Sequence, residues 1–223
     1  MSEADYGVLW LSVHVATGCV VVSLPPALVL GAILARYEFP GKAILDGVCH
    51  LPLVLPPVVT GYVLLVLFGR RGVIGEALND LGVHIAFDWK GAVLASAVVG
   101  FPLMLRAIRQ GVASVDPRLE GAARTLGAKP LYAFCVVTLR LAAPAIAVGC
   151  LLSFARSLGE FGATITFVSN IPGETQTLPL AVFSYLNQPD GEASAWRLVL
   201  VSIGVSFVAL ILSDRLSRRL DTR

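Results

Sequence analysis

The chain has 223 residues, of which 56% are hydrophobic and only 14% are charged. A soluble domain carries roughly 25% charged residues, so this composition excludes an ordinary soluble protein. The formal net charge of +2 is spread over several loops, and no nucleic-acid partner is expected. The sequence predicts an all-α, polytopic helical membrane protein that forms one domain over residues 1–223 and contacts lipid.

Five apolar segments have the length of about 20 residues that crosses a bilayer core. They are residues 8–35, 49–69, 91–110, 131–156 and 196–213. Pro25-Pro26 in the first segment and Phe101-Pro102 in the third predict kinks. The first segment is too long for the apolar core of a cleaved signal, so we expect it to stay in the membrane.

A short polar island, residues 114–127, separates the third and fourth segments. Asp116 is a good N-cap, Pro117 suits the first helical position, and Gly127 can end a helix in the left-handed conformation. The side chains that recur on one face are Leu119, Ala122, Ala123 and Leu126. A helix of about ten residues is marginal by itself in water, so we expect this one to pack on a soluble partner.

Residues 157–188 contain two short, weakly apolar pieces divided by Pro172-Gly173-Glu174. Each piece is short for a span, and irregular backbone at membrane depth is tolerated only where protein buries it or a cavity adjoins it. We expect an external re-entrant segment here. The alternative is a sixth span.

The basic residues orient the chain. With the N-terminus outside and the C-terminus in the cytoplasm, most of the 17 lysines and arginines lie inside, as the positive-inside rule requires. The basic residues left outside are Arg70, Arg71, Lys90, Arg156 and Arg197. The polar island is then cytoplasmic.

Catalytic and metal-binding patterns are lacking in the sequence. The four cysteines stand singly and the three histidines are scattered, so no metal site is expected. Gly41-Lys42 lacks the rest of a phosphate-binding loop, so we expect no catalytic residue, ATPase site or cofactor. We expect His14 and His50 to form interhelical hydrogen bonds. The spans carry almost no charge apart from Glu160, which disfavours an ion-coupled transporter.

The polar island resembles the cytoplasmic loop of ATP-binding-cassette importer permeases, which has the form E-A-A-x-x-x-G followed by I-x-L-P. Here residues 121–127 read G-A-A-R-T-L-G and residues 137–140 read V-T-L-R. The chain departs at Gly121, where the family has Glu and this chain has Glu120 one place earlier, and at Arg140 in place of Pro. Segments similar to the molybdate branch of the family are LPLVLPPVVTG (51–61), SLGEFGA (157–163) and NIPGETQTLPL (170–180).

The resemblance implies the type I importer permease fold in an inner-membrane complex. It implies a homodimer with the path along its two-fold axis, two cytoplasmic ATPase subunits and an external molybdate-binding protein. The loop at about 111–130 would couple to the ATPase. The coupling residues would be Leu119, Glu120, Gly121, Ala122, Ala123, Leu126 and Gly127.

Polar side chains in or beside the spans are candidates for lining the path. They are Thr60, Ser153, Ser157, Glu160 and Thr164. A hydrogen bond to its own helix backbone is an equal alternative for each hydroxyl, and Glu160 is alternatively an interfacial carboxylate. The expected function is ATP-driven import of molybdate or tungstate. The alternatives are a sulfate or thiosulfate permease and, from another class, a stand-alone channel or secondary transporter.

Overall fold

The computed structural model describes residues 3–221, and every regular element in that range is helical. The predicted all-α class is therefore confirmed. The elements are α1 (Glu3–Arg36), α2 (Lys42–Val54), α3 (Pro57–Phe68), α4 (Val73–Asp80), α5 (Trp89–Ser114), α6 (Pro117–Thr125), α7 (Pro130–Ala133), the π-helical turn η1 (Phe134–Thr138), α8 (Leu139–Leu141), α9 (Ala143–Leu158), α10 (Gly162–Val168), α11 (Leu178–Leu186) and α12 (Glu192–Asp221).

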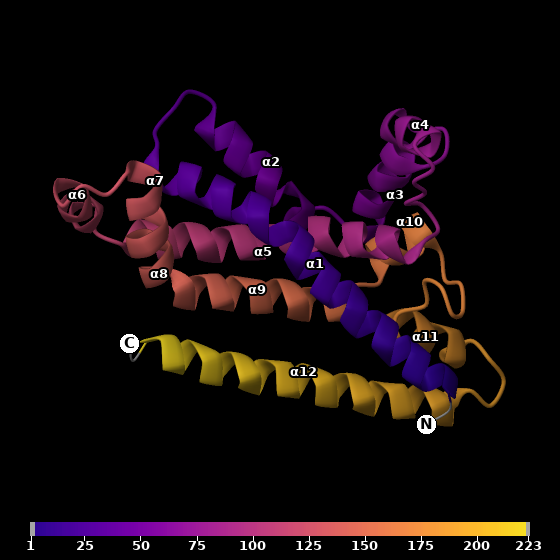
Figure 1. The fold of residues 1–223 in the computed structure, drawn as a ribbon. Helices are drawn as coiled ribbons and strands as arrows, with labels where there is room; N and C mark the ends of the chain where they lie inside the picture. Colours follow the sequence, from indigo (N-terminus) through magenta and orange to yellow (C-terminus); the bar gives the residue numbers. More distant parts are fainter. Residues whose placement is uncertain (1–2, 222–223) are drawn as a thin grey trace.

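Helix α5 is the centre of the bundle, with α1 and α9 packed along it (Figure 1). In its most apolar stretch 67% of the residues are buried, against 28% in α1. Small residues allow this close approach, because a Cβ on Gly111 would stand 2.4 Å from the Cβ of Ala145 on α9. Such packing holds helices together in a membrane, where lipid is as apolar as the side chains.

The second predicted span is wrong as a single helix. Residues 49–69 are divided between α2 and α3, and the chain bends by 114° between the two helices. Pro56 supplies the physical reason, because it has no N–H to donate and its ring disfavours helical backbone in the preceding residue. Leu55 accordingly has extended backbone, with ψ of 143°. A broken helix pair stands where the sequence predicts one span.

The fourth predicted span, residues 131–156, is broken as well. The stretch from α7 to α8 meets α9 at 68°. Pro144 stands in the first turn of α9, where its ring prevents the helix before it from continuing. By contrast, α1 and α5 each continue as one helix through Pro25-Pro26 and Pro102, and the kinks predicted there stay predictions.

Length and apolar composition let α1 and α5 each cross a membrane, and each bent pair can supply one further span. Helix α12 covers the last predicted segment with 30 residues. The predicted segments thus correspond to α1, α2 with α3, α5, α7 to α9, and α12. The count of five or six spans stays a prediction.

Helices α10 and α11 occupy the segment predicted to be re-entrant. They have 7 and 9 residues, so neither is long enough by itself to be a sixth span. Helix α10 packs against α3 so closely that a Cβ on Gly61 would lie 2.5 Å from the carbonyl oxygen of Ala163. Helix α11 is tied to α1, because the hydroxyl of Ser12 accepts a hydrogen bond from the N–H of Leu178 at 2.7 Å. The position of this segment in a membrane stays a prediction.

The two ends of the bundle carry different elements (Figure 1). Helix α6 stands at one end, whereas α4, α10, α11 and the start of α1 lie at the other. Helix α5 continues to Ser114, so the loop predicted at about 111–130 begins later than expected. The polar island and the start of α1 thus lie at opposite ends, as the predicted orientation requires, while the side that faces outward stays a prediction.

Candidate coupling site

Helix α6 is the helix predicted in the polar island. The carboxylate of Asp116 accepts a hydrogen bond from the N–H of Arg118 at 2.9 Å, as expected of an N-cap. Gly127 has a φ of +93°, and the N–H groups of Gly127 and Ala128 donate back into the last turn. Glycine suits this ending because a left-handed residue without a Cβ carries no steric cost. Both predicted helix ends are confirmed.

The apolar face of α6 is largely uncovered within residues 3–221, where Leu119, Ala122 and Leu126 are exposed and Ala123 is partly buried. None of its residues is buried. Leu126, just after the last turn, is 89% exposed, and Leu119 is 48% exposed. A Cβ on Gly121 would meet nothing within 4 Å. Apolar surface of this kind is what a docking site for another protein would present, and that role stays a prediction for α6.

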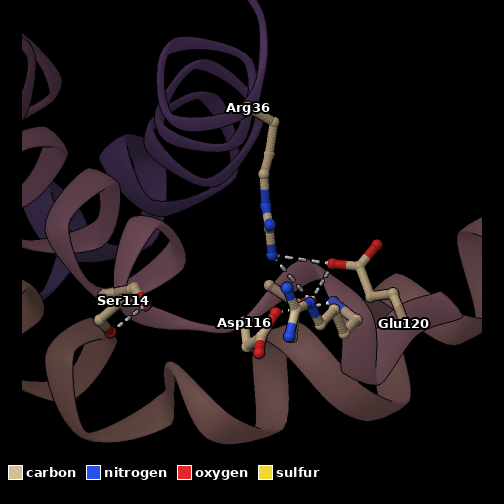
Figure 2. A network of polar contacts seen from close by, with 7 residues as sticks. Arg36, Ser114, Asp116 and Glu120 are labelled. Carbon is tan, nitrogen blue, oxygen red and sulfur yellow. Dashed lines mark hydrogen bonds and ion pairs between the residues drawn. The ribbon is translucent and has the colours of Figure 1, made fainter. Parts of the chain in front are cut away.

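Glu120 holds α6 to the bundle (Figure 2). Its Oε1 accepts a hydrogen bond from Nη2 of Arg36 at 2.9 Å and another from the hydroxyl of Thr138. Arg36 is the last residue of α1, and Thr138 is the last residue of η1. One carboxylate oxygen therefore joins three elements. The two charged side chains are only 18% and 24% exposed, so salt screens this pair less than a surface pair.

The junction between α5 and α6 is short and ordered by hydrogen bonds. Only Val115 and Asp116 separate the two helices, and Val115 is buried. The hydroxyl of Ser114 donates to the carbonyl of Gly111 at 2.8 Å (Figure 2). Because α6 is joined covalently to α5 and through Glu120 to α1 and η1, a displacement of α6 would be passed to all three.

Arg36 and Thr138 are functional candidates that the sequence analysis missed. Arg36 lies 84 residues from Glu120, and a basic residue at the end of a helix is too common to signal a pairing. Thr138 is fully buried in a π-helical turn, a rare conformation that is frequent at functional sites. Neither the turn nor the ion pair has a local sequence signal.

The structure buries the four hydroxyl candidates for the path. Ser153 and Ser157 lie on α9, where the hydroxyl of Ser153 is 3.4 Å from the thiol of Cys19 on α1. Thr60 on α3 and Thr164 on α10 are buried on two helices that pack together. Ser153 and Ser157 are thus brought together on one helix, and their role in lining a path stays a prediction.

Glu160 is buried rather than exposed at a surface, with only 2% of the residue accessible. One of its carboxylate oxygens lies 2.7 Å from Nη1 of Arg156, and the other accepts a hydrogen bond from the N–H of Ala163 at 2.8 Å. The side chain thus joins the end of α9 to the first turn of α10. A part in the path stays a prediction for this residue as well.

Long apolar helices packed through small residues, with a capped and uncovered helix at one end, define a helical membrane protein that can receive a soluble partner. The chain belongs to the family of binding-protein-dependent transport system inner membrane components, which matches residues 27–222.

Named relatives in this family are similar over nearly the whole chain. The molybdenum transport system permease protein ModB of Escherichia coli K12 is 53% identical over 98% of this chain and 96% of its own length. ModB of Haemophilus influenzae is 52% identical, with 96% and 93% covered. The sulfate transport system permease protein CysT of E. coli K12 is 36% identical, with 97% and 78% covered.

Solved structures share the fold at low identity. A bacterial ABC transporter involved in the import of the acidic polysaccharide alginate superposes with a TM-score of 0.77 at 16% identity, covering 98% of this chain and 80% of that one. The MetNI methionine ABC transporter gives a TM-score of 0.69 at 16% identity, with 99% of both chains covered. The predicted fold of a type I importer permease is confirmed.

Proposed function

We propose that this chain is the permease subunit of an ATP-driven importer that carries molybdate or tungstate across the inner membrane. The observation that carries the proposal is the 53% identity to ModB over 98% of the chain. Sulfate is the less favoured cargo, because CysT is 36% identical. The permease itself has no catalytic role in this account, and separate ATPase subunits hydrolyse the ATP.

Helix α6 couples the permease to the ATPase by packing in a groove of that subunit. Its uncovered apolar face and small residues support this role, since small side chains let two backbones approach closely. Six of the predicted coupling residues form the docking surface: Leu119, Gly121, Ala122, Ala123, Leu126 and Gly127. Glu120, the seventh, points to Arg36 and Thr138, so it acts by transmitting the motion of α6 to the bundle.

The complete importer contains two copies of this chain, two cytoplasmic ATPase subunits and an external molybdate-binding protein. One small bundle offers only part of the wall of a passage, so the second copy completes the path along the two-fold axis. The N-terminus faces outward and α12 ends in the cytoplasm. The placement of α6 and the start of α1 at opposite ends of the bundle supports this orientation (Figure 1).

Uptake of labelled molybdate into proteoliposomes tests the cargo and the energy source together. The permease, ATPase and binding protein are reconstituted, and tungstate or sulfate is added at equal concentration. We expect uptake that requires ATP and is competed by tungstate but not by sulfate. Strong competition by sulfate would assign the chain to sulfate transport. Accumulation against a gradient by the permease alone would overturn the proposal in favour of a secondary transporter.

Labelling from each side of the membrane tests the orientation. A Leu126→Cys variant, with the four native cysteines replaced by serine, carries one thiol at a position that is 89% exposed. We expect a membrane-impermeant maleimide to label it in inside-out vesicles and not in intact cells. The reverse pattern would place α6 outside and exclude an ATPase as its partner.

A further inference from the structure

Four ionisable side chains line a cavity of about 220 Å³ between α2 and α5. Asp46 and His50 lie one turn apart on α2, and Arg106 and Arg109 lie three residues apart on α5. These spacings place each pair on one face of its helix. The proposed function uses none of the four residues.

Asp46 contacts two of the other three residues, Arg109 and His50. Its Oδ1 lies 2.8 Å from Nη1 of Arg109, and its carbonyl oxygen lies 2.8 Å from Nδ1 of His50. Because a carbonyl oxygen only accepts, Nδ1 carries the proton and Nε2 is the free nitrogen of the ring. The hydrogen bond of His50 is therefore within α2, and the predicted interhelical bond is wrong for this residue.

Arg106 has no hydrogen bond or ion pair within residues 3–221. Its guanidinium stays charged at any physiological pH and offers five N–H groups in a planar fork. Two guanidinium groups and one carboxylate leave the cavity with an excess of positive charge. Arg106 is exposed and lines the cavity, so its guanidinium is open to an anion that enters from outside the chain.

We propose that this cavity binds a tetrahedral oxyanion, with Arg106 as its main ligand and the remaining N–H groups of Arg109 beside it. Two sources supply this chemistry. One is the transported oxyanion, an assignment that rests on the proposed function, and the other is the phosphate of a lipid headgroup. The planar fork of arginine matches two oxygens of either group.

The position of the cavity suits a transient binding site at the inner end of the path. An α-helix rises about 1.5 Å per residue, so Arg109 lies roughly 8 Å before the end of α5, close to the end of the bundle that carries α6 (Figure 1). Asp46 keeps the site weak by neutralising Arg109. A weak site suits transport, because an ion must leave each site it enters.

Two substitutions with opposite expected effects test the site. The complex of the permease with its ATPase is purified in detergent without the external binding protein, and equilibrium dialysis measures the binding of labelled molybdate and of inorganic phosphate. Arg106→Gln should lower oxyanion affinity roughly tenfold or more, the loss expected for a charged hydrogen-bonding ligand. Asp46→Asn should raise it, because the competing carboxylate is gone. Arg71→Gln removes an exposed guanidinium in the loop before α4 and serves as the control.

A phosphorus assay of the phospholipid retained by each purified variant separates the two sources. Binding of free molybdate that Arg106→Gln weakens identifies the transported ion, and retained lipid that this variant loses identifies a headgroup. Equal anion binding and equal lipid in wild type and Arg106→Gln would overturn the site, and normal molybdate uptake would then leave the proposed function standing. Absent uptake in a wild type that still binds phosphate through Arg106 would instead overturn the proposed function alone.

Discussion

Helices α5 and α6 begin with the same kind of cap but differ in how far the rest of the chain covers them. Each starts at an aspartate, Asp88 or Asp116, whose carboxylate accepts the N–H two residues on at 2.9 Å. Beyond that cap α5 is enclosed by α1, α9 and α10, whereas α6 buries none of its residues. The same local chemistry thus opens a helix that its own chain covers and a helix that is left uncovered.

The two helices differ in what packs against their small residues. Gly111 on α5 faces Ala145 so closely that no side chain fits, while Gly121 on α6 faces open space. Small residues on α5 are matched to neighbours in the same chain. Of the small residues on α6, Gly121 and Ala122 are exposed and Ala123 is only partly buried, and under the proposed function the ATPase covers them.

The largest effect is expected from a charge on the uncovered face. Ala122→Asp should leave insertion and folding intact, because Ala122 is exposed, yet abolish uptake by placing an unpaired carboxylate in the docking groove. Gly127→Trp should act similarly through its bulk and its φ of +93°. Uptake and ATPase rates are measured at equal amounts of assembled complex. Ala77→Asp, on an exposed position of α4 at the other end, is the matched control. Normal uptake by Ala122→Asp would contradict the docking role.

The same substitution at two glycines should change stability in opposite directions. Gly111→Ala places a Cβ 2.4 Å from that of Ala145, and such overpacking costs about 1–3 kcal/mol. Gly121→Ala meets nothing and should stabilise α6 by about 0.5–1 kcal/mol, because alanine restricts the unfolded chain. Thermal unfolding of the purified permease measures the stability of the bundle in both variants. Hydrogen exchange of the α6 amides measures the local stability of α6. Equal losses of stability would mean that α6 is packed like α5.

Local signals in the sequence were enough to predict α6. Asp116 and Gly127 mark its ends through their own backbone chemistry, and the apolar spacing marks its face. The break between α2 and α3 also had a local signal at Pro56, but length and hydropathy alone favoured one continuous span. Hydropathy measures whether a segment prefers lipid and says nothing about its direction.

The polar contacts could not be predicted in the same way, because they join residues far apart in the chain. Asp46 and Arg109 are separated by 63 residues, and Arg36 and Glu120 by 84. Taken alone, Arg36, Asp46 and Arg109 look like ordinary charges near the ends of spans, and Glu120 looks like an ordinary charge of the polar island. The packing of α2 on α5 brings Asp46 to Arg109, and the packing of α6 on η1 beside the end of α1 brings Glu120 to Arg36.

Loss of the contacts that Glu120 makes with Arg36 and Thr138 should reduce uptake less than loss of docking does. Glu120→Gln leaves Arg36 half-buried without its counter-charge, at a cost of about 2 kcal/mol for a charge-assisted hydrogen bond. Uptake per ATP hydrolysed should fall several-fold while the ATPase stays bound, because α6 still docks but moves more freely. Arg36→Gln should give the same loss, and the double variant should lose no more than either alone. Additive losses would show that the two side chains act independently.

The smallest effect is expected from the cap of α6. Asp116→Ala removes the acceptor for the N–H of Arg118 and should destabilise the first turn by about 1 kcal/mol. The contacts of Glu120 with Arg36 and Thr138 hold this same turn and remain, so uptake should fall by no more than a few-fold. Asp116→Asn should restore uptake because asparagine caps equally well. Removal of the equivalent cap by Asp88→Ala should leave α5 helical, since its neighbours enclose it. Hydrogen exchange of both helices in the two variants measures how far each helix frays. Fraying of α5 as large as that of α6 would show that enclosure by the chain does not protect α5 against loss of its cap.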